Sequence, residues 1–122
     1  EQRLLLVQDI HLHNGYVIGA LVEGELVGMA ALDCQYISGF RLRLAELVVL
    51  DGQQHAAVNL LNHVKAHARQ LEAEGLYICA TSSKEQIDFY LQQNARLAKR
   101  LDGYLRQLYE AEIHLEIPLS VK

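Results

Sequence analysis

The segment between residues 41 and 80 constrains the fold more than any other part of the chain. Residues 41–50 begin with an alternation of Arg and Leu and end in an apolar run. This pattern predicts a central strand that is exposed on one face at its start and buried on both faces at its end. Residues 56–74 carry apolar side chains at three- and four-residue steps, which predicts an amphipathic helix stopped by Gly75. Residues 76–80 predict a second buried strand, so the unit requires parallel pairing through a right-handed crossover.

An antiparallel hairpin is predicted ahead of this unit. Residues 16–22 and 25–32 are apolar, partly β-branched runs, and Glu23-Gly24 between them is suited to a tight turn. The opening residues 1–12 contain several apolar side chains and are predicted to form a helix.

The second half of the chain predicts three shorter elements. Ser82 or Ser83 can cap a helix, with Glu85 or Gln86 three residues further on, and Asn94 can end that helix in the left-handed conformation. Residues 101–108 suggest a helical turn or two, and residues 113–119 alternate as a closing strand in which Pro118 suits the end or an edge. With no internal repeat or linker, residues 1–122 are expected to form one domain with an α/β fold.

Composition narrows the classes of function. With 51% apolar residues the chain can bury a core without disulfides or metals. The net charge of −4 and the lack of a Lys/Arg stripe argue against nucleic-acid binding. No run of about 18 apolar residues suggests a membrane span, and no signal-peptide pattern opens the chain. Cys34 and Cys79 lie within apolar runs and predict buried thiols in a reducing compartment, the cytoplasm.

The order of these elements resembles the GNAT N-acetyltransferase superfamily over nearly the whole chain. Three short motifs lie where the family has similar residues, at positions 26–28 in its third strand, 45–49 in its fourth and 87–90 on its late helix. The resemblance implies a mixed-sheet α/β fold and an N-acyltransferase that transfers an acyl group directly from acetyl-CoA to a small-molecule or peptide amine. Because the hairpin starts at residue 16, the family's first strand and first helix are expected to be absent, leaving an N-terminally abbreviated fold.

The resemblance also implies where acetyl-CoA binds. The family carries Arg/Gln-x-x-Gly-x-Gly/Ala at this helix start, where backbone N–H groups surround a pyrophosphate. Ala57 fits the last position, whereas His55 replaces the central glycine and Gly52 replaces Arg/Gln. The loop is shorter than the family's by about two residues, and a Cβ at His55 narrows the cradle and disfavours positive φ. The implied cofactor-binding residues are Leu47, Val48, Val49, Leu50, Gln53, Gln54, His55, Ala56, Ala57 and Ser83.

Tyr90 and Glu46 are the candidate catalytic residues. Tyr90 matches the family tyrosine that protonates the leaving thiolate, although it could equally be a core aromatic. Alternation places Glu46 on the strand face of Leu42, Leu44 and Val48, and a carboxylate in apolar company is suited to act as a base. The alternative for Glu46 is a structural carboxylate paired with a nearby arginine or a backbone amide. Ser83 stands where many family members have a cofactor-contacting Asn, and a simple helix cap is the preferred interpretation.

The histidines and Cys79 are weaker candidates for a functional site. His63 and His67 have the i, i+4 spacing of a zinc pair, but their face is polar and no third ligand follows by spacing, so no metal is expected. His11 and His13 could line a substrate cleft or lie on the surface. Cys79 has no neighbouring histidine in the sequence and is not expected to be a nucleophile.

Two further interpretations remain open beside the enzyme. One is a non-catalytic GNAT-like module that senses a ligand or binds a protein partner, and the other is an accessory domain that dimerises. A homodimer is compatible with any of the three. The acidic balance favours a cationic acceptor such as an amine.

Overall fold

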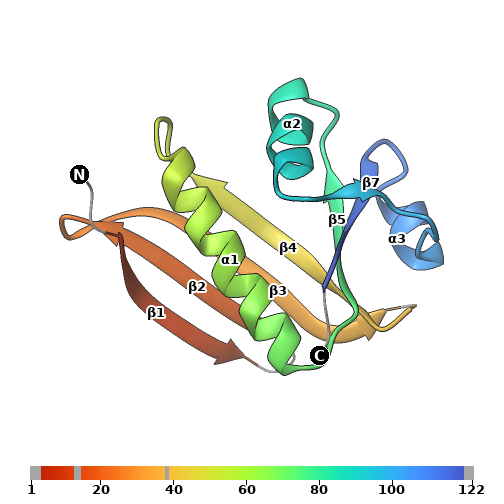
Figure 1. Ribbon diagram of the computed structural model, residues 1–122, viewed down its shortest axis with the longest axis horizontal. Coiled ribbons are helices and arrows are strands. Elements are labelled where there is room, and N and C mark those ends of the chain that lie inside the picture. Colours follow the sequence, from red (N-terminus) through yellow and green to blue (C-terminus); the bar gives the residue numbers. More distant parts are fainter. Residues whose placement is uncertain (1–3, 13–14, 38, 120–122) are drawn as a thin grey trace.

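The computed structural model describes residues 4–12, 15–37 and 39–119, with the side chains of residues 4–12 and of residue 36 not described. Within these ranges seven strands form one mixed sheet in the order β1-β2-β3-β4-β5-β7-β6 (Figure 1). Only β4 and β5 pair in parallel; every other neighbouring pair is antiparallel. The elements are β1 Leu4–Leu12, β2 Gly15–Val22, β3 Glu25–Ile37, β4 Arg41–Val49, α1 Gln54–Gln70, β5 Gly75–Ala80, α2 Lys84–Gln92, β6 Arg96–Leu97, α3 Gly103–Leu108 and β7 Ile113–Pro118. The predicted strand-helix-strand unit and mixed sheet are confirmed.

The N-terminal half of the sheet contains one strand that the sequence did not predict. The β2–β3 hairpin is confirmed, and Glu23 and Gly24 both adopt positive φ in its turn, as a two-residue primed turn requires. Residues 4–12 form β1 and pair antiparallel with β2, so the predicted helix is wrong. The predicted absence of a first strand is also wrong, although no helix precedes β2 in the described residues. The periodicity of a short apolar run cannot distinguish a helix from a strand. Here the segment forms a strand because it pairs with the edge of β2.

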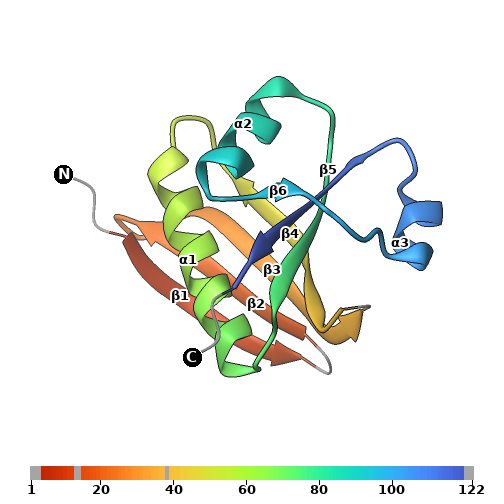
Figure 2. The same cartoon turned by 45° about the vertical axis from the view of Figure 1, so that its right-hand side comes forward.

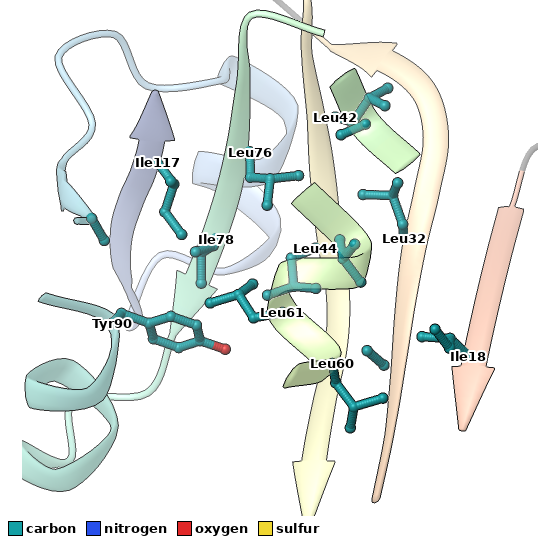
Figure 3. Packing of buried hydrophobic residues seen from close by; sticks show 14 of the residues in the cluster. Ile18, Leu32, Leu42, Leu44, Leu60, Leu61, Leu76, Ile78, Tyr90 and Ile117 are labelled. Carbon is teal, nitrogen blue, oxygen red and sulfur yellow. The ribbon is translucent and has the colours of Figure 1, made fainter. Parts of the chain in front are cut away.

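The main core lies between α1 and one face of the sheet. In Figures 1 and 2, α1 crosses the strands β2 to β4 on one side. Leu60, Leu61 and Val64 on this helix are completely buried, and Figure 3 shows the two leucines among side chains from β2, β3, β4 and β5. Burying one such side chain stabilises the fold by about 1.5–3 kcal/mol, so this contact fixes α1 on the sheet.

The helix α1 ends earlier than predicted. Its last residue is Gln70, and Glu72 takes the left-handed conformation with φ of 65°. The N–H of Ala73 then donates to the carbonyl of Ala68 at 3.0 Å, the bond that defines a Schellman ending. Gly75 therefore does not stop the helix. It starts β5 instead, where an added Cβ would lie 3.3 Å from the carbonyl oxygen of Ile117.

The helix α2 has the ends that the sequence predicts. The Ser83 hydroxyl accepts a hydrogen bond from the N–H of Gln86 at 3.1 Å, which makes Ser83 the N-cap. Asn94 follows the helix with φ of 72°, and the N–H of Ala95 donates to the carbonyl of Tyr90 at 3.0 Å. These local bonds orient α2 so that Tyr90 points toward the sheet.

A second, smaller buried layer lies on the sheet face opposite α1. Tyr77 and Leu105 are buried outside the main cluster, and α3 carries Leu105. The Tyr77 hydroxyl lies 2.6 Å from His114 Nδ1, while His114 Nε2 lies 3.1 Å from the carbonyl oxygen of Tyr109. Since that carbonyl can only accept, Nε2 carries the proton and Tyr77 donates to Nδ1. The segment with α3 is thus tied to β5 and β7 by directed hydrogen bonds.

Both cysteines differ from their predicted burial. Cys34 and Cys79 are free thiols, and both are half-buried rather than buried. Desolvation is the main cause that raises the pKa of each thiol. Within the described ranges, no helix combines the length and the apolar character needed to cross a bilayer.

Gly28 provides a test of the packing between β3, β4 and α1. A Cβ at this position would lie 2.6 Å from Val49 Cγ1, 3.0 Å from the carbonyl oxygen of Val48 and 3.2 Å from Leu60 Cδ1. We expect Gly28→Ala to lower the free energy of unfolding by about 1–3 kcal/mol, because overpacking forces the neighbours apart. Chemical denaturation measures this change. Gly103→Ala is the matched control, since nothing lies within 4 Å of its added Cβ, and equal stability losses in the two variants would contradict the prediction.

Candidate functional site

The parallel pairing of β4 with β5 stops before the end of both strands. The register runs from Arg41 opposite Gly75 to Leu44 opposite Ile78, whereas β4 continues to Val49 and β5 to Ala80. Figure 1 shows the two strands diverging beyond this point. The backbone N–H and C=O groups on that edge of β4 have no strand partner there, so they are available to a ligand that lies extended along it.

A β-bulge in β4 lies where the divergence begins. The β3–β4 register passes from Leu32 opposite Leu44 to Ala31 opposite Glu46, which leaves Ala45 as the extra residue. A bulge of this kind exchanges the two faces of the strand for every residue that follows it.

This exchange corrects two predictions about β4. Leu42 and Leu44 lie in the core under α1, and beyond the bulge Leu47 and Val49 pack against that same core. Glu46 therefore lies on the opposite face and is exposed, so it does not share a face with Leu42 and Leu44 and is not enclosed by apolar side chains. The strand is also more exposed at its end than at its start, because Val48 and Leu50 on the new face are 53% and 60% exposed.

Tyr90 approaches the opening from the α1 side of the sheet. Its side chain is only 5% exposed, and Figure 3 shows the ring beside Ile78 and Leu61. Burial, together with the negative charge of Glu46, raises the pKa of Tyr90 to about 12. In the described part of the chain no group forms a hydrogen bond with the hydroxyl. Tyr90 is therefore a protonated donor whose pKa responds to burial and to the charge of Glu46, and the two predicted catalytic residues lie on opposite faces of the sheet.

The loop before α1 is less strained than the sequence suggests. Its positive φ falls on Gly52, at 82°, where an added Cβ would meet nothing within 4 Å. His55 lies in the first turn of α1 with its side chain exposed, so its Cβ does not demand a left-handed backbone. The predicted conflict between the His55 Cβ and a positive φ therefore does not arise.

Three amides at this helix start are available to an anion. The N–H of Gln53 donates to the carbonyl of Leu50 at 3.1 Å, and the N–H of Ala57 donates to the carbonyl of Gln53 at 3.2 Å. The N–H groups of residues 54–56 between them have no acceptor within the helix, and no side chain caps them. The first turn carries no acidic residue that would repel a phosphate. Of the five predicted amides, those of residues 54–56 thus have no acceptor within the helix, whereas those of Gln53 and Ala57 already donate to backbone carbonyls.

Ser83 and the histidines fall outside this arrangement. Ser83 is exposed and serves as the N-cap of α2, its preferred interpretation. His63 is exposed, but His67 is half-buried and stacks on Tyr16 with ring centroids 3.8 Å apart, so the predicted solvated histidine face is wrong at His67. No group of three His, Cys, Asp or Glu side chains in the described residues could hold a metal ion. His13 and the side chain of His11 lie outside the described residues.

Cys79 does have a histidine neighbour, contrary to prediction. The β5–β7 pairing sets it opposite His114, and its Sγ lies 3.9 Å from His114 Nδ1. Because Nδ1 already accepts from Tyr77, and because burial raises the pKa of the thiol, this contact does not activate Cys79.

A cavity on the face opposite α1 was not predicted. Its volume is about 470 Å³, and it lies between β3, β4 and α3. Its lining residues are Asp33, Gln35, Ile37, Arg43, Tyr104 and Leu105. Alternation in residues 41–44 placed Arg43 on one face of β4, but no local pattern indicated that α3 would cover that face.

Solved acetyltransferases share this fold. N-acetylglutamate synthase from Neisseria gonorrhoeae, complexed with coenzyme A and N-acetyl-glutamate, superimposes with a TM-score of 0.71 at 21% identity, over 85% of this chain and 26% of that one. The IAA acetyltransferase from Bacillus cereus superimposes with a TM-score of 0.69 at 18% identity, over 87% of this chain and 79% of that one. An acetyltransferase of the GNAT family from Staphylococcus aureus superimposes with a TM-score of 0.66 at 17% identity, over 88% of this chain and 69% of that one. No family model and no curated protein matches the chain in sequence. The predicted GNAT fold is confirmed.

The high pKa of Tyr90 predicts a stability change at alkaline pH. In the unfolded chain a tyrosine loses its proton near pH 10, whereas folded Tyr90 keeps it to about pH 12. Between these values the unfolded state binds fewer protons than the folded state, so the free energy of unfolding falls as pH rises. The contribution is fully present below about pH 10. We expect urea unfolding at a series of pH values to show a shallower fall in Tyr90→Phe than in the wild type. Tyr104→Phe, at a 71% exposed side chain, should retain the wild-type slope, and identical slopes for wild type and Tyr90→Phe would refute the assignment.

Proposed function

We propose that the chain is an acyl-CoA-dependent N-acyltransferase that uses acetyl-CoA and transfers its acyl group directly to an amine. The observation that carries the proposal is the opening between β4 and β5, which Tyr90 approaches from one sheet face and Glu46 from the other. The likeness to solved acetyltransferases, one of them a coenzyme A complex, supports it.

The chain has suitable groups to hold the cosubstrate. The uncapped N–H groups of residues 54–56, at the positive end of the α1 dipole, suit a diphosphate. The unpaired edge of β4 over residues 47–50 suits an extended arm with amide groups, such as pantetheine. Acetyl-CoA, when bound, supplies an acyl group activated as a thioester.

The acid and the base are assigned from their positions. Glu46, exposed on the face opposite α1, accepts a proton from the incoming amine, directly or through water. The amine nitrogen then forms a bond to the acyl carbon as the carbon–sulfur bond breaks, and the second amine proton leaves to solvent or base. Tyr90 donates its proton to the departing sulfur and regains one from solvent. A pKa of about 12 keeps that proton on Tyr90 until negative charge develops beside it.

A charge substitution at the helix start tests the cosubstrate site. We expect His55→Glu to weaken acetyl-CoA binding about tenfold, which corresponds to about 1.4 kcal/mol, because it adds a negative charge beside the diphosphate. The same change should leave the fold equally stable or more stable, by about 0.3–1 kcal/mol, because an acidic side chain favours a helix N-terminus. Calorimetric titration measures the affinity, and thermal melting measures the stability.

His63→Glu makes the same change in charge at an exposed position in the middle of α1 and is the matched control. Equal affinities in the two variants would place the diphosphate elsewhere. A wild-type melting temperature that does not respond to millimolar acetyl-CoA would remove the proposal altogether.

Substitution of the acid and the base tests the chemistry. We expect Tyr90→Phe and Glu46→Gln each to reduce kcat by about 10²–10⁴-fold while the affinity for acetyl-CoA stays within about twofold of the wild type. Release of the CoA thiol across a panel of amines gives the rate. Glu25→Gln, at the exposed first residue of β3, is the control for the loss of one carboxylate. A wild type that binds acetyl-CoA but acylates no amine would favour the ligand-sensing alternative.

A further inference from the structure

Arg43 has a buried donor without a partner. Its Nε is enclosed and forms no hydrogen bond, and no carboxylate of the described residues forms an ion pair with it. The centroid of the Tyr109 ring lies 4.8 Å from the guanidinium carbon, and the guanidinium charge interacts with the Cys79 thiol. Buried polar atoms in folded proteins are rarely left without a partner, so a ligand or water is expected to supply the missing acceptor.

Arg43 also lies at the entrance to the proposed reaction site. Cys79, whose thiol interacts electrostatically with the guanidinium, is the first residue of β5 beyond the last pair with β4. Because the bulge at Ala45 exchanges the faces of β4, Arg43 and Glu46 share the face opposite α1. Arg43 and Glu46 are three residues apart on one strand, and at about 3.3 Å per residue their Cα atoms lie about 10 Å apart. Because both side chains are long, their charged ends can come closer than that. One small molecule can therefore contact both.

The cavity beside Arg43 has the size and lining of a small-ligand site. Its volume of about 470 Å³ lies in the range of small-molecule pockets, and Ile37, Tyr104 and Leu105 give it an apolar wall. Asp33 is the acidic residue in the lining, and its carboxylate accepts a hydrogen bond from the N–H of Gln35 at 3.1 Å. Its charge disfavours a ligand with a second carboxylate.

A larger hollow, of about 1090 Å³, lies on another side of α3 and is a weaker candidate. Charges of both signs line it, among them Lys99, Arg106 and Glu112, and no unpartnered buried atom of the described chain belongs to its lining. It offers no chemical preference comparable to that of Arg43.

We propose that the cavity on the face opposite α1 binds an acceptor amine that carries a single carboxylate and an apolar body, with Arg43 holding the carboxylate. An apolar amino acid is the simplest molecule of this class. A guanidinium presents Nε–H and a terminal N–H in the fork that matches a carboxylate, so binding gives the orphan donor its partner. The role of this ligand as acceptor rests on the proposed acyl transfer, whereas the binding site itself does not.

The test compares two ligands that differ only in the carboxylate. L-phenylalanine and L-phenylalaninamide are titrated into the full chain labelled with ¹⁵N at arginine, and the Arg43 Nε–H resonance is followed. We expect L-phenylalanine to shift this resonance to saturation and the amide to bind at least about tenfold more weakly, because it lacks the charge-assisted pair. L-glutamate should also bind more weakly than L-phenylalanine. Equal affinity for the acid and the amide would overturn the proposal.

Variants at Arg43 separate recognition of the carboxylate from general effects on the fold. Arg43→Gln should bind the acid and the amide equally, with an unchanged melting-temperature response to acetyl-CoA. If Arg43→Gln does not fold, Arg43→Lys takes its place, because lysine keeps the charge and lacks the Nε–H group. This variant should lose most of the preference for L-phenylalanine over L-phenylalaninamide. A preference that persists in the folded variant would place the carboxylate elsewhere.

Two outcomes distinguish this proposal from the proposed function. Carboxylate-dependent binding through Arg43 in a chain that does not bind acetyl-CoA would keep the site and remove the acyltransferase. Acyl transfer to L-phenylalaninamide with the same kcat/KM as to L-phenylalanine would keep the acyltransferase and remove the site.

Discussion

The short parallel pairing of β4 with β5 is the constraint on which the rest of the structure depends. β4 pairs with β3 along nearly its whole length, and β5 pairs with β7 over all six of its residues. Between these two well-paired halves, only the four residue pairs from Arg41–Gly75 to Leu44–Ile78 connect the sheet. Since α1 packs on the N-terminal half and also contacts β5, the two halves stay together. The C-terminal ends of β4 and β5 nevertheless separate beyond the last of these pairs. A sheet with full pairing at this point would leave no room between Tyr90 and Glu46.

The two faces of the sheet are stabilised in different ways. The face under α1 is held by apolar burial, which is strong and not directional. The opposite face is held by hydrogen bonds and charges, with Glu116 accepting from the buried Arg41 at 3.3 Å and from the half-exposed Arg96 at 2.9 Å. Such pairs add little net stability, but losing one partner leaves a buried charge and is costly, so they fix position. They fix β6 and the segment leading to α3, which forms one wall of the cavity beside Arg43.

Local patterns predicted the elements whose formation is decided locally. The hairpin around Glu23-Gly24, the Ser83 cap and the Asn94 ending each depend on residues within one turn of chain, and all three were predicted correctly. The failures concern long-range pairing. Residues 4–12 form a strand because β2 presents an open edge, and Cys79 faces His114 because β7 returns beside β5. The bulge at Ala45 has no signature in the alternation of residues 41–50, yet it decides which face Glu46 occupies.

The same bulge explains how the Tyr90 hydroxyl and the Glu46 carboxylate come to have opposite environments. Tyr90 lies on the buried side of the sheet, where desolvation disfavours the phenolate and the proton is retained. Glu46 lies on the exposed side, where water stabilises the carboxylate as an acceptor. Without the extra residue, Glu46 would share the face of Leu42 and Leu44 and point under α1 into the core. The position of one backbone irregularity thus places a buried hydroxyl and an exposed carboxylate on opposite faces of the sheet, beside the opening between β4 and β5.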